Sequence, residues 1–169
     1  MSTAHERLNA ASAEVAAELL GRCCGSKRWV ARMTQRLPFA SDAALHAVAD
    51  HAWTDLDRAD YLEAFSHHPR LGGDMAKLRA RFAAADWSAG EQSGVAAADE
   101  ATLEALRAGN AAYEARFGFV FLLCATGKGA HEVLARLEDR IGNDPATELH
   151  IAAAEQAKIT HLRLDKLAA

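Results

Sequence analysis

Apolar residues recur along most of the chain at intervals of three and four positions, which is the spacing that predicts amphipathic α-helices. Caps, glycines and prolines interrupt these repeats often, so the helices should be short. Residues 1–11 carry no clear repeat, and we expect an irregular segment there. The predicted helices cover residues 12–22, 27–36, 42–55, 58–65, 75–85, 89–116, 130–140 and 145–166. The expected fold class is therefore all-α, a single irregular globule of about eight or nine short helices.

Helix starts are marked by polar residues whose side chains accept a hydrogen bond from the first turn. The expected N-cap residues are Ser12, Ser26, Ser41 and Asp57. Ser88 and Glu91 have the spacing of a capping box. The long predicted helix that follows is either one helix or two segments that meet near residues 98–99. In the helix over residues 12–22, the face formed by Val15, Leu19 and Leu20 is expected to point inward.

One apolar run, Phe117 to Ala125, does not show its secondary structure through periodicity. Its β-branched and aromatic residues suit a short strand, but a buried helical piece has the same pattern. Because no other run in the chain would pair with it, we expect an extended core segment or the end of a helix. Residues 126–129 should then form a turn.

The 169 residues are half hydrophobic and a quarter charged, with a net charge of −4, as in an ordinary soluble domain. No basic stripe indicates nucleic acid as a partner, and no apolar run approaches the roughly 18 residues that indicate a membrane span. The three cysteines, Cys23, Cys24 and Cys124, do not form a disulfide framework. With no secretory pattern at the start, we expect a cytoplasmic protein.

The strongest candidate for chemistry is the stretch from Phe65 to Gly73, which contains His67, His68 and Pro69. Proline disfavours helical geometry in the residue before it, so His68 should lie where a helix ends. A histidine held on a turn is suited to proton transfer near neutral pH. The alternative is a plain helix terminator, in which the histidines interact favourably with a helix C-terminus.

Other polar positions keep structural alternatives of their own. Glu91 is either a functional carboxylate or only part of its capping box. Arg163 is either functional or only favourable near the end of its helix. A metal site built from His67, His68, Asp74 and Glu91 is chemically possible, but nothing in their spacing favours it.

Several short motifs, taken together and in order, resemble a known family, the 2-oxo-4-hydroxy-4-carboxy-5-ureidoimidazoline (OHCU) decarboxylases. The resemblance covers roughly residues 8–167. The motifs are Cys24-Gly25-Ser26 followed by Trp29, His68-Pro69-Arg70-Leu71-Gly72, Glu91-Gln92, Arg116-Phe117-Gly118-Phe119, Thr126-Gly127-Lys128, and Glu155-Gln156-Ala157-Lys158-Ile159 with Arg163-Leu164. One departure is Gly129, where many members carry serine.

The resemblance implies one domain over residues 1–169 that converts OHCU to (S)-allantoin in urate breakdown, part of purine catabolism. It implies no metal and no organic cofactor, a small-molecule substrate as the only ligand, and a homodimer. The catalytic residues that it implies are His68, Glu91 and Arg163. The substrate-binding residues that it implies are Pro69, Ser88, Gln92 and the segment 121–125, in which Phe121, Leu123 and Ala125 would present backbone groups.

The chemistry agrees with these residue types. Loss of CO2 leaves an electron pair, and OHCU carries its own sink because a C=N bond adjoins the carbon that bears the carboxylate. We expect His68 to donate the proton, and His67 to be a solvated neighbour. Two rival hypotheses remain: a non-catalytic helical binding module, and a metal-dependent hydrolase that uses His67 and His68.

Overall fold

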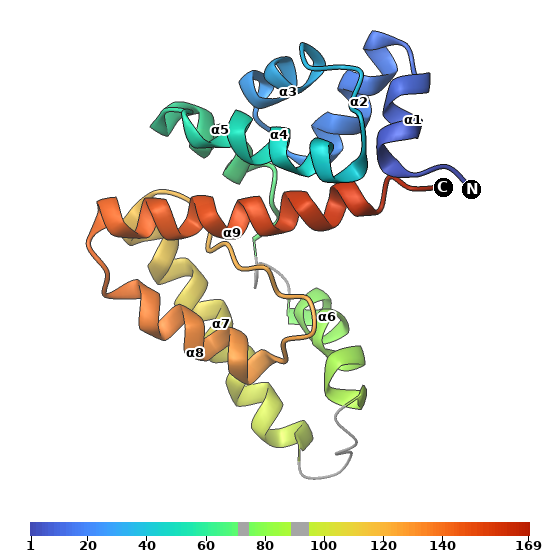
Figure 1. Ribbon diagram of the computed structural model, residues 1–169. Helices are drawn as coiled ribbons and strands as arrows, with labels where there is room; N and C mark the ends of the chain where they lie inside the picture. The colour runs from blue at the N-terminus through green and yellow to red at the C-terminus, as the bar shows by residue number, and fades with distance from the viewer. Residues whose placement is uncertain (71–74, 89–94) are drawn as a thin grey trace. The chain divides into compact units, whose positions relative to one another are not determined.

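A computed structural model describes the chain except residues 71–74 and 89–94, and it gives no side-chain description for residues 83–99. The described residues form nine helices and no strand (Figure 1), which confirms the all-α fold class. The helices are α1 Ala4–Ala10, α2 Ala13–Cys23, α3 Lys27–Thr34, α4 Asp42–Thr54, α5 Arg58–Ser66, α6 Met75–Ser88, α7 Val95–Phe117, α8 Ala130–Ile141 and α9 Pro145–Asp165.

The chain divides into two compact units. The first unit contains Met1–His67 together with Ala153–Ala169, and the second unit contains His68–Ala152. The division therefore falls inside α9 and directly before His68. The prediction of one domain over the whole chain stays a prediction, and each unit is described below by itself.

The predicted N-caps Ser12, Ser26, Ser41 and Asp57 are confirmed. Each side-chain oxygen accepts a hydrogen bond from the backbone N–H three residues on, at 3.0–3.3 Å. These bonds satisfy donors that the first turn of a helix leaves without a partner. The proposed capping box from Ser88 to Glu91 lies outside the part of the chain that is described in side-chain detail.

The prediction of an irregular segment over residues 1–11 is wrong, because α1 forms there. Thr3 and Glu6 make a reciprocal capping box: the Thr3 N–H donates to the Glu6 carboxylate at 2.9 Å, and the Thr3 hydroxyl accepts from the Glu6 N–H. Ala4 and Leu8 are buried on one side of this helix. Two buried positions are too few to show a period in the sequence, but they suffice once the helix packs on its neighbours.

The first unit keeps its core around two tryptophans. The Trp29 indole N–H donates to the Ala49 carbonyl at 3.1 Å, and the Trp53 indole N–H donates to the Ala153 carbonyl at 2.9 Å. These bonds tie α3 to α4, and α4 to the part of α9 that belongs to this unit, while the indole rings stay buried. Contrary to expectation, Val15 is 46% exposed, although Leu19 and Leu20 on the same helix are buried.

In the second unit, α7 is one continuous helix over Val95–Phe117, which decides between the two alternatives: the helix does not divide near residues 98–99. The prediction that the helices are short is wrong for α7 and α9, which have 23 and 21 residues. Gly109 allows close packing of α7 on α8, because a Cβ there would lie 2.9 Å from Leu137 Cδ2. Buried aromatic rings continue the core beyond α7, where Tyr113 packs against Phe117, Phe119 and Phe121.

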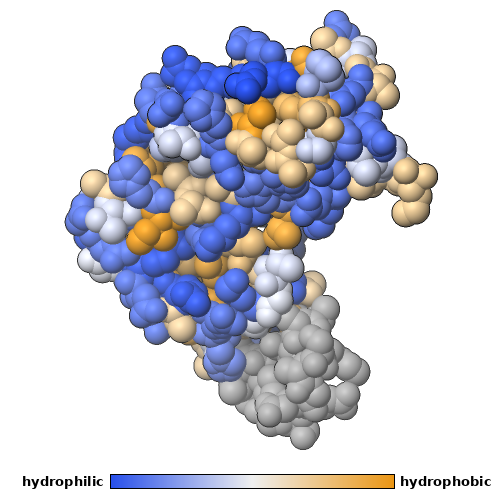
Figure 2. All heavy atoms as spheres, viewed as in Figure 1, coloured by the Kyte–Doolittle hydropathy of each residue, from blue (hydrophilic) through white to orange (hydrophobic). Residues whose placement is uncertain are grey.

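Large apolar side chains are mostly covered. Among the described residues, only Met1 and Val15 are exposed large hydrophobic residues. The space-filling view agrees, since its visible face is mainly hydrophilic with small hydrophobic patches (Figure 2). None of the described helices combines the length and the apolar character that a bilayer crossing requires.

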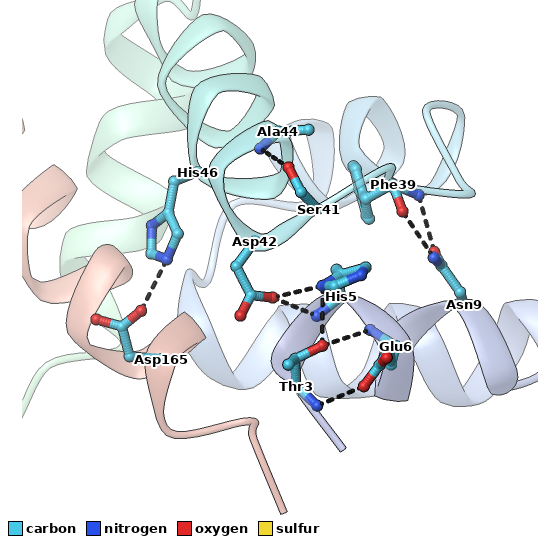
Figure 3. A network of polar contacts seen from close by, with 10 residues as sticks. All are labelled: Thr3, His5, Glu6, Asn9, Phe39, Ser41, Asp42, Ala44, His46 and Asp165. Atoms are coloured by element: carbon cyan, nitrogen blue, oxygen red, sulfur yellow. Dashed lines mark hydrogen bonds and ion pairs between the residues drawn. The ribbon is translucent and has the colours of Figure 1, made fainter. Parts of the chain in front are cut away.

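The start of α4 holds α1 through Asp42 (Figure 3). Its Oδ1 atom accepts hydrogen bonds from the His5 backbone N–H and from the His5 ring Nδ1, each at 2.8 Å. These bonds, the backbone one foremost, lower the pKa of the Asp42 carboxyl. A carboxyl whose pKa is lower in the folded chain stabilises the fold above its unfolded-state pKa, and this contribution disappears as the pH falls through the folded-state pKa.

We therefore expect Asp42→Asn to lower the thermal unfolding midpoint at pH 7. The difference from the unmodified protein should shrink as the pH falls below about 4, where an unperturbed aspartate becomes protonated. Circular dichroism melts across this range measure it. Asp139→Asn is the control, because that exposed carboxylate has no hydrogen bond among the described residues. An equal loss at pH 7 and pH 3 would contradict the assignment.

Candidate functional site

His67, in the stretch from Phe65 to Gly73, lies against the turn Cys24-Gly25-Ser26 in the first unit. His67 is the C-cap residue of α5. A Cβ built on Gly25 would lie 2.5 Å from His67 Cγ and 2.4 Å from His67 Cδ2. Only glycine leaves room for the imidazole in this position. The motif Cys24-Gly25-Ser26, which connects α2 to α3, is therefore the surface on which the end of α5 rests.

Two polar contacts hold α5 against the same turn. The Glu63 carboxylate accepts the Lys27 backbone N–H at 2.7 Å, which satisfies a free donor at the start of α3. The Arg28 guanidinium donates to the Asp60 carboxylate at 3.2 Å. The direction in which the chain leaves α5 is thus set by contacts on α3 and by the absent side chain of Gly25.

Arg163 lies on α9 near the same turn. Its charge lowers the pKa of both Cys23 and Cys24, but burial is the larger effect and raises these values to about 12 and about 11. Neither thiol is therefore a nucleophile at neutral pH. Arg163 itself is half-buried, and no carboxylate among the described residues forms an ion pair with it.

His68 and Pro69 follow at the start of the second unit. His68 is half-buried and Pro69 is exposed, in a bend directly after α5. Arg70, the next residue, pairs with Glu114 of α7 at 2.6 Å. The prediction that His68 lies just beyond a helix end agrees with this geometry, but its catalytic role stays a prediction.

Three of the predicted site residues lie outside the part of the chain that is described in side-chain detail. Glu91 and Gln92 lie outside the described residues. Ser88 is the last residue of α6, and its side chain is not described. Of the conceivable metal ligands, Asp74 and Glu91 also lie outside. In the described part of the chain, no group of three or more histidine, cysteine or carboxylate residues is arranged to hold a metal ion.

The predicted segment 121–125 is neither helix nor strand. Phe121 is buried, while Leu123 and Ala125 are half-buried. The predicted turn after it is confirmed: the Lys128 N–H donates to the Ala125 carbonyl at 3.0 Å, and Gly127 has a φ of +76°, which favours glycine. The segment therefore leaves the aromatic cluster of Tyr113 as irregular chain that covers the core.

A buried ion pair stands behind this segment. Arg140 Nε lies 2.5 Å from the Glu148 carboxylate, and Glu148 is completely buried. Arg140 Nη1 donates to the Leu122 carbonyl at 2.6 Å, and the guanidinium carbon lies 4.6 Å from the Phe121 ring centre. Sequence reasoning missed Arg140, since a helix-terminal arginine in a regular charge pattern looks like any surface residue.

The predicted residues thus divide between the two units. The Arg163 side chain and the glycine turn belong to the first unit, whereas His68, Pro69 and the segment 121–125 belong to the second. Within the first unit, the structure brings Arg163 near the Cys24-Gly25-Ser26 turn, against which His67 also packs. Gly25 was noted in the motif, but its contact with His67 was not foreseen.

Comparison with known proteins gives a consistent result. The sequence model of the family described as OHCU decarboxylase matches residues 9–165. The chain is 39% identical over 147 residues to the uric acid degradation bifunctional protein TTL of Arabidopsis thaliana, with 86% of this chain aligned. It spans only 45% of that plant protein's length.

Two further similarities cover most of both partners. The chain is 36% identical to the 2-oxo-4-hydroxy-4-carboxy-5-ureidoimidazoline decarboxylase of Amia calva, over 77% of this chain and 74% of that protein. A crystal structure of OHCU decarboxylase in the presence of (S)-allantoin superposes with a TM-score of 0.72 at 32% identity. That match covers 93% of this chain and 98% of the other.

The contact between Gly25 and His67 can be tested by stability alone. Gly25→Ala should cost about 1–3 kcal/mol of unfolding free energy, as overpacking does. In a His67→Ala background this cost should become smaller, because the ring atoms at 2.4 and 2.5 Å are gone and only the Cβ of residue 67, at 3.0 Å, remains close. Urea denaturation of the unmodified protein, the two single variants and the double variant measures the coupling free energy between the two positions.

Gly21→Ala is the matched control on α2. A Cβ at Gly21 would meet nothing within 4 Å, so this exchange should stabilise the helix by roughly 0.5–1 kcal/mol. If Gly25→Ala costs the same with and without the His67 ring, the close approach is not what requires the glycine.

Proposed function

This chain belongs to the OHCU decarboxylase family, and from that membership we propose that it decarboxylates OHCU to (S)-allantoin in urate breakdown. The proposal concerns the chain as a carboxy-lyase. Its relatives include proteins named as bifunctional and proteins named as OHCU decarboxylases, and the chain corresponds to less than half of the bifunctional plant relative.

The observation that carries the proposal is the setting of Arg163. The residue is half-buried, and no described carboxylate forms an ion pair with its guanidinium. A half-buried arginine that no described carboxylate neutralises is suited to bind a ligand, because its planar fork of donors matches a carboxylate or a carbonyl oxygen. OHCU and allantoin both offer such oxygens.

The reaction needs a site that orients the substrate more than it needs a reagent. When the bond from the ring carbon to the carboxylate breaks, its electron pair forms a C=C bond to the neighbouring carbon, and the C=N nitrogen takes up the displaced pair. One proton is then delivered to the neighbouring carbon, and the enol hydroxyl becomes a carbonyl by releasing its own proton. The ring nitrogen that took up the electron pair gains a proton, so that one proton is consumed overall. No external electron sink is required, so the proposal includes no metal and no organic cofactor.

His68 is proposed as the donor of the proton that is delivered to the neighbouring carbon. Histidine exchanges a proton near neutral pH, and delivery from one fixed side produces one enantiomer. Its place after α5 supports the assignment, because the contacts of α5 with α3 and Gly25 define the start of this stretch. His67 has a different environment, since its ring packs on the glycine turn.

The other proposed roles follow from residue chemistry. Glu91 would accept the hydrogen bond of the substrate hydroxyl or polarise His68. Gln92 offers a donor and an acceptor for the amide-like edges of the substrate. Ser88 and Pro69 would line the site, and the backbone of Phe121, Leu123 and Ala125 would bind polar substrate atoms. We also propose a cytoplasmic homodimer, as the family resemblance implies.

The activity is tested with OHCU generated from urate in situ. Ultraviolet absorbance follows its decay, and circular dichroism follows the product, since spontaneous decay gives racemic allantoin. We expect faster decay and an excess of the (S) enantiomer, with no effect of a chelator. If the protein neither accelerates the decay nor produces an excess of the (S) enantiomer, a non-catalytic binding module is the better hypothesis. If a chelator reduces the activity, a metal-dependent hydrolase is favoured.

The two histidines should separate clearly in this assay. His68→Asn should reduce turnover on the order of 10²-fold or more, because it removes the proposed proton donor. His67→Ala should have a much smaller effect on turnover. Thermal melts of both variants show that the fold is intact. If His67→Ala loses as much activity as His68→Asn, the proton donor has been assigned to the wrong residue.

A further inference from the structure

Two cationic side chains hold alternate carbonyl groups of the segment 121–125. Arg140 Nη1 donates to the Leu122 carbonyl at 2.6 Å, and Lys128 Nζ donates to the Cys124 carbonyl at 2.9 Å. All of these groups belong to the second unit. The two carbonyls belong to residues two positions apart, so two peptide carbonyls of the segment are each held by a cationic side chain.

The peptide groups between them have a different environment. In the described part of the chain, no hydrogen bond is made by the backbone N–H or C=O of Phe121 or Leu123. Such groups in a covered segment are normally paired, so these are polar groups suited to bind a ligand.

Neither cation is placed to act as a charge on the substrate. The Arg140 guanidinium is neutralised by the fully buried Glu148 and covered by the Phe121 ring. Its Nη2 atom also faces the Tyr113 hydroxyl at 3.5 Å. Lys128 is half-buried, with its ammonium group on a carbonyl of its own turn. Both side chains therefore act on the backbone of the segment.

We propose that Arg140 and Lys128 are positioning residues, which hold the carbonyls of Leu122 and Cys124 so that the peptide groups of Phe121 and Leu123 face the substrate. This inference rests on the proposed function. It assigns the recognition of amide-like substrate edges to a backbone whose orientation is set by side chains that do not touch the substrate. It also explains why a charged pair is kept inside an aromatic core, where burial is costly.

Lys128→Met gives the sharpest test, because it keeps the length of the side chain and removes only the donor. We expect KM for OHCU to rise about five- to tenfold while kcat changes by less than about twofold, since the loss is one of orientation for binding. Lys128→Arg, which keeps a donor, should restore most of the affinity. Lys166→Met, at an exposed lysine beyond α9, is the matched control.

Arg140→Lys is the second variant, because it keeps the charge opposite Glu148 but loses the fork that reaches Glu148 and Leu122 together. Arg140→Lys should also raise KM for OHCU, and circular dichroism shows whether this variant folds. If it does not fold, the Lys128 variants alone test the inference. Binding of (S)-allantoin by calorimetry should weaken in parallel with KM. Unchanged KM and unchanged allantoin binding in folded Lys128→Met would overturn the inference while the proposed function stands. An unmodified protein that does not act on OHCU would overturn both.

Discussion

The buried pair of Arg140 and Glu148 is the constraint on which the second unit depends. Removing one partner of such a pair typically costs about 3–5 kcal/mol, because the other charge stays buried without compensation. Here the arginine also binds the Leu122 carbonyl and lies on the Phe121 ring. A single guanidinium thus joins α8 to the start of α9 and to the irregular chain after α7. The apolar residues alone would bury this segment without defining which way its peptide groups face.

In the first unit, a missing side chain has a comparable role. Gly25 lets the His67 ring approach the turn between α2 and α3, and the bond from Glu63 to the Lys27 N–H keeps α5 against it. Near the same turn, α9 supplies Arg163, whose charge acts on Cys23 and Cys24. The family motif around Gly25 therefore has a physical explanation. It is a docking surface for the helix that precedes His68, and its buried thiols serve as packing groups with raised pKa values.

Much of the helical architecture followed from local chemistry. Four serine and aspartate caps were correctly predicted, because a cap is a contact between residues three positions apart and needs no tertiary information. The helix α1 was missed because its buried face is only Ala4 and Leu8, and its stability comes from packing. The exposure of Val15 was missed for the same reason, since periodicity identifies an apolar face but not how far a neighbouring helix extends over it.

For the site, the sequence alone determined the residue types and their order: the histidine stretch, the arginine on the last helix and the apolar segment 117–125. Their family resemblance could be seen there because motifs are local. Only the tertiary structure decided that Gly25 meets His67, that Arg163 lies near the cysteine turn, and that Arg140 is buried on Glu148 and Leu122. These contacts join residues on different helices or on loops, so a period along one element does not predict them. An arginine is either an exposed surface charge or a buried residue that binds several groups. Which of the two it is depends on the groups that tertiary packing places next to it.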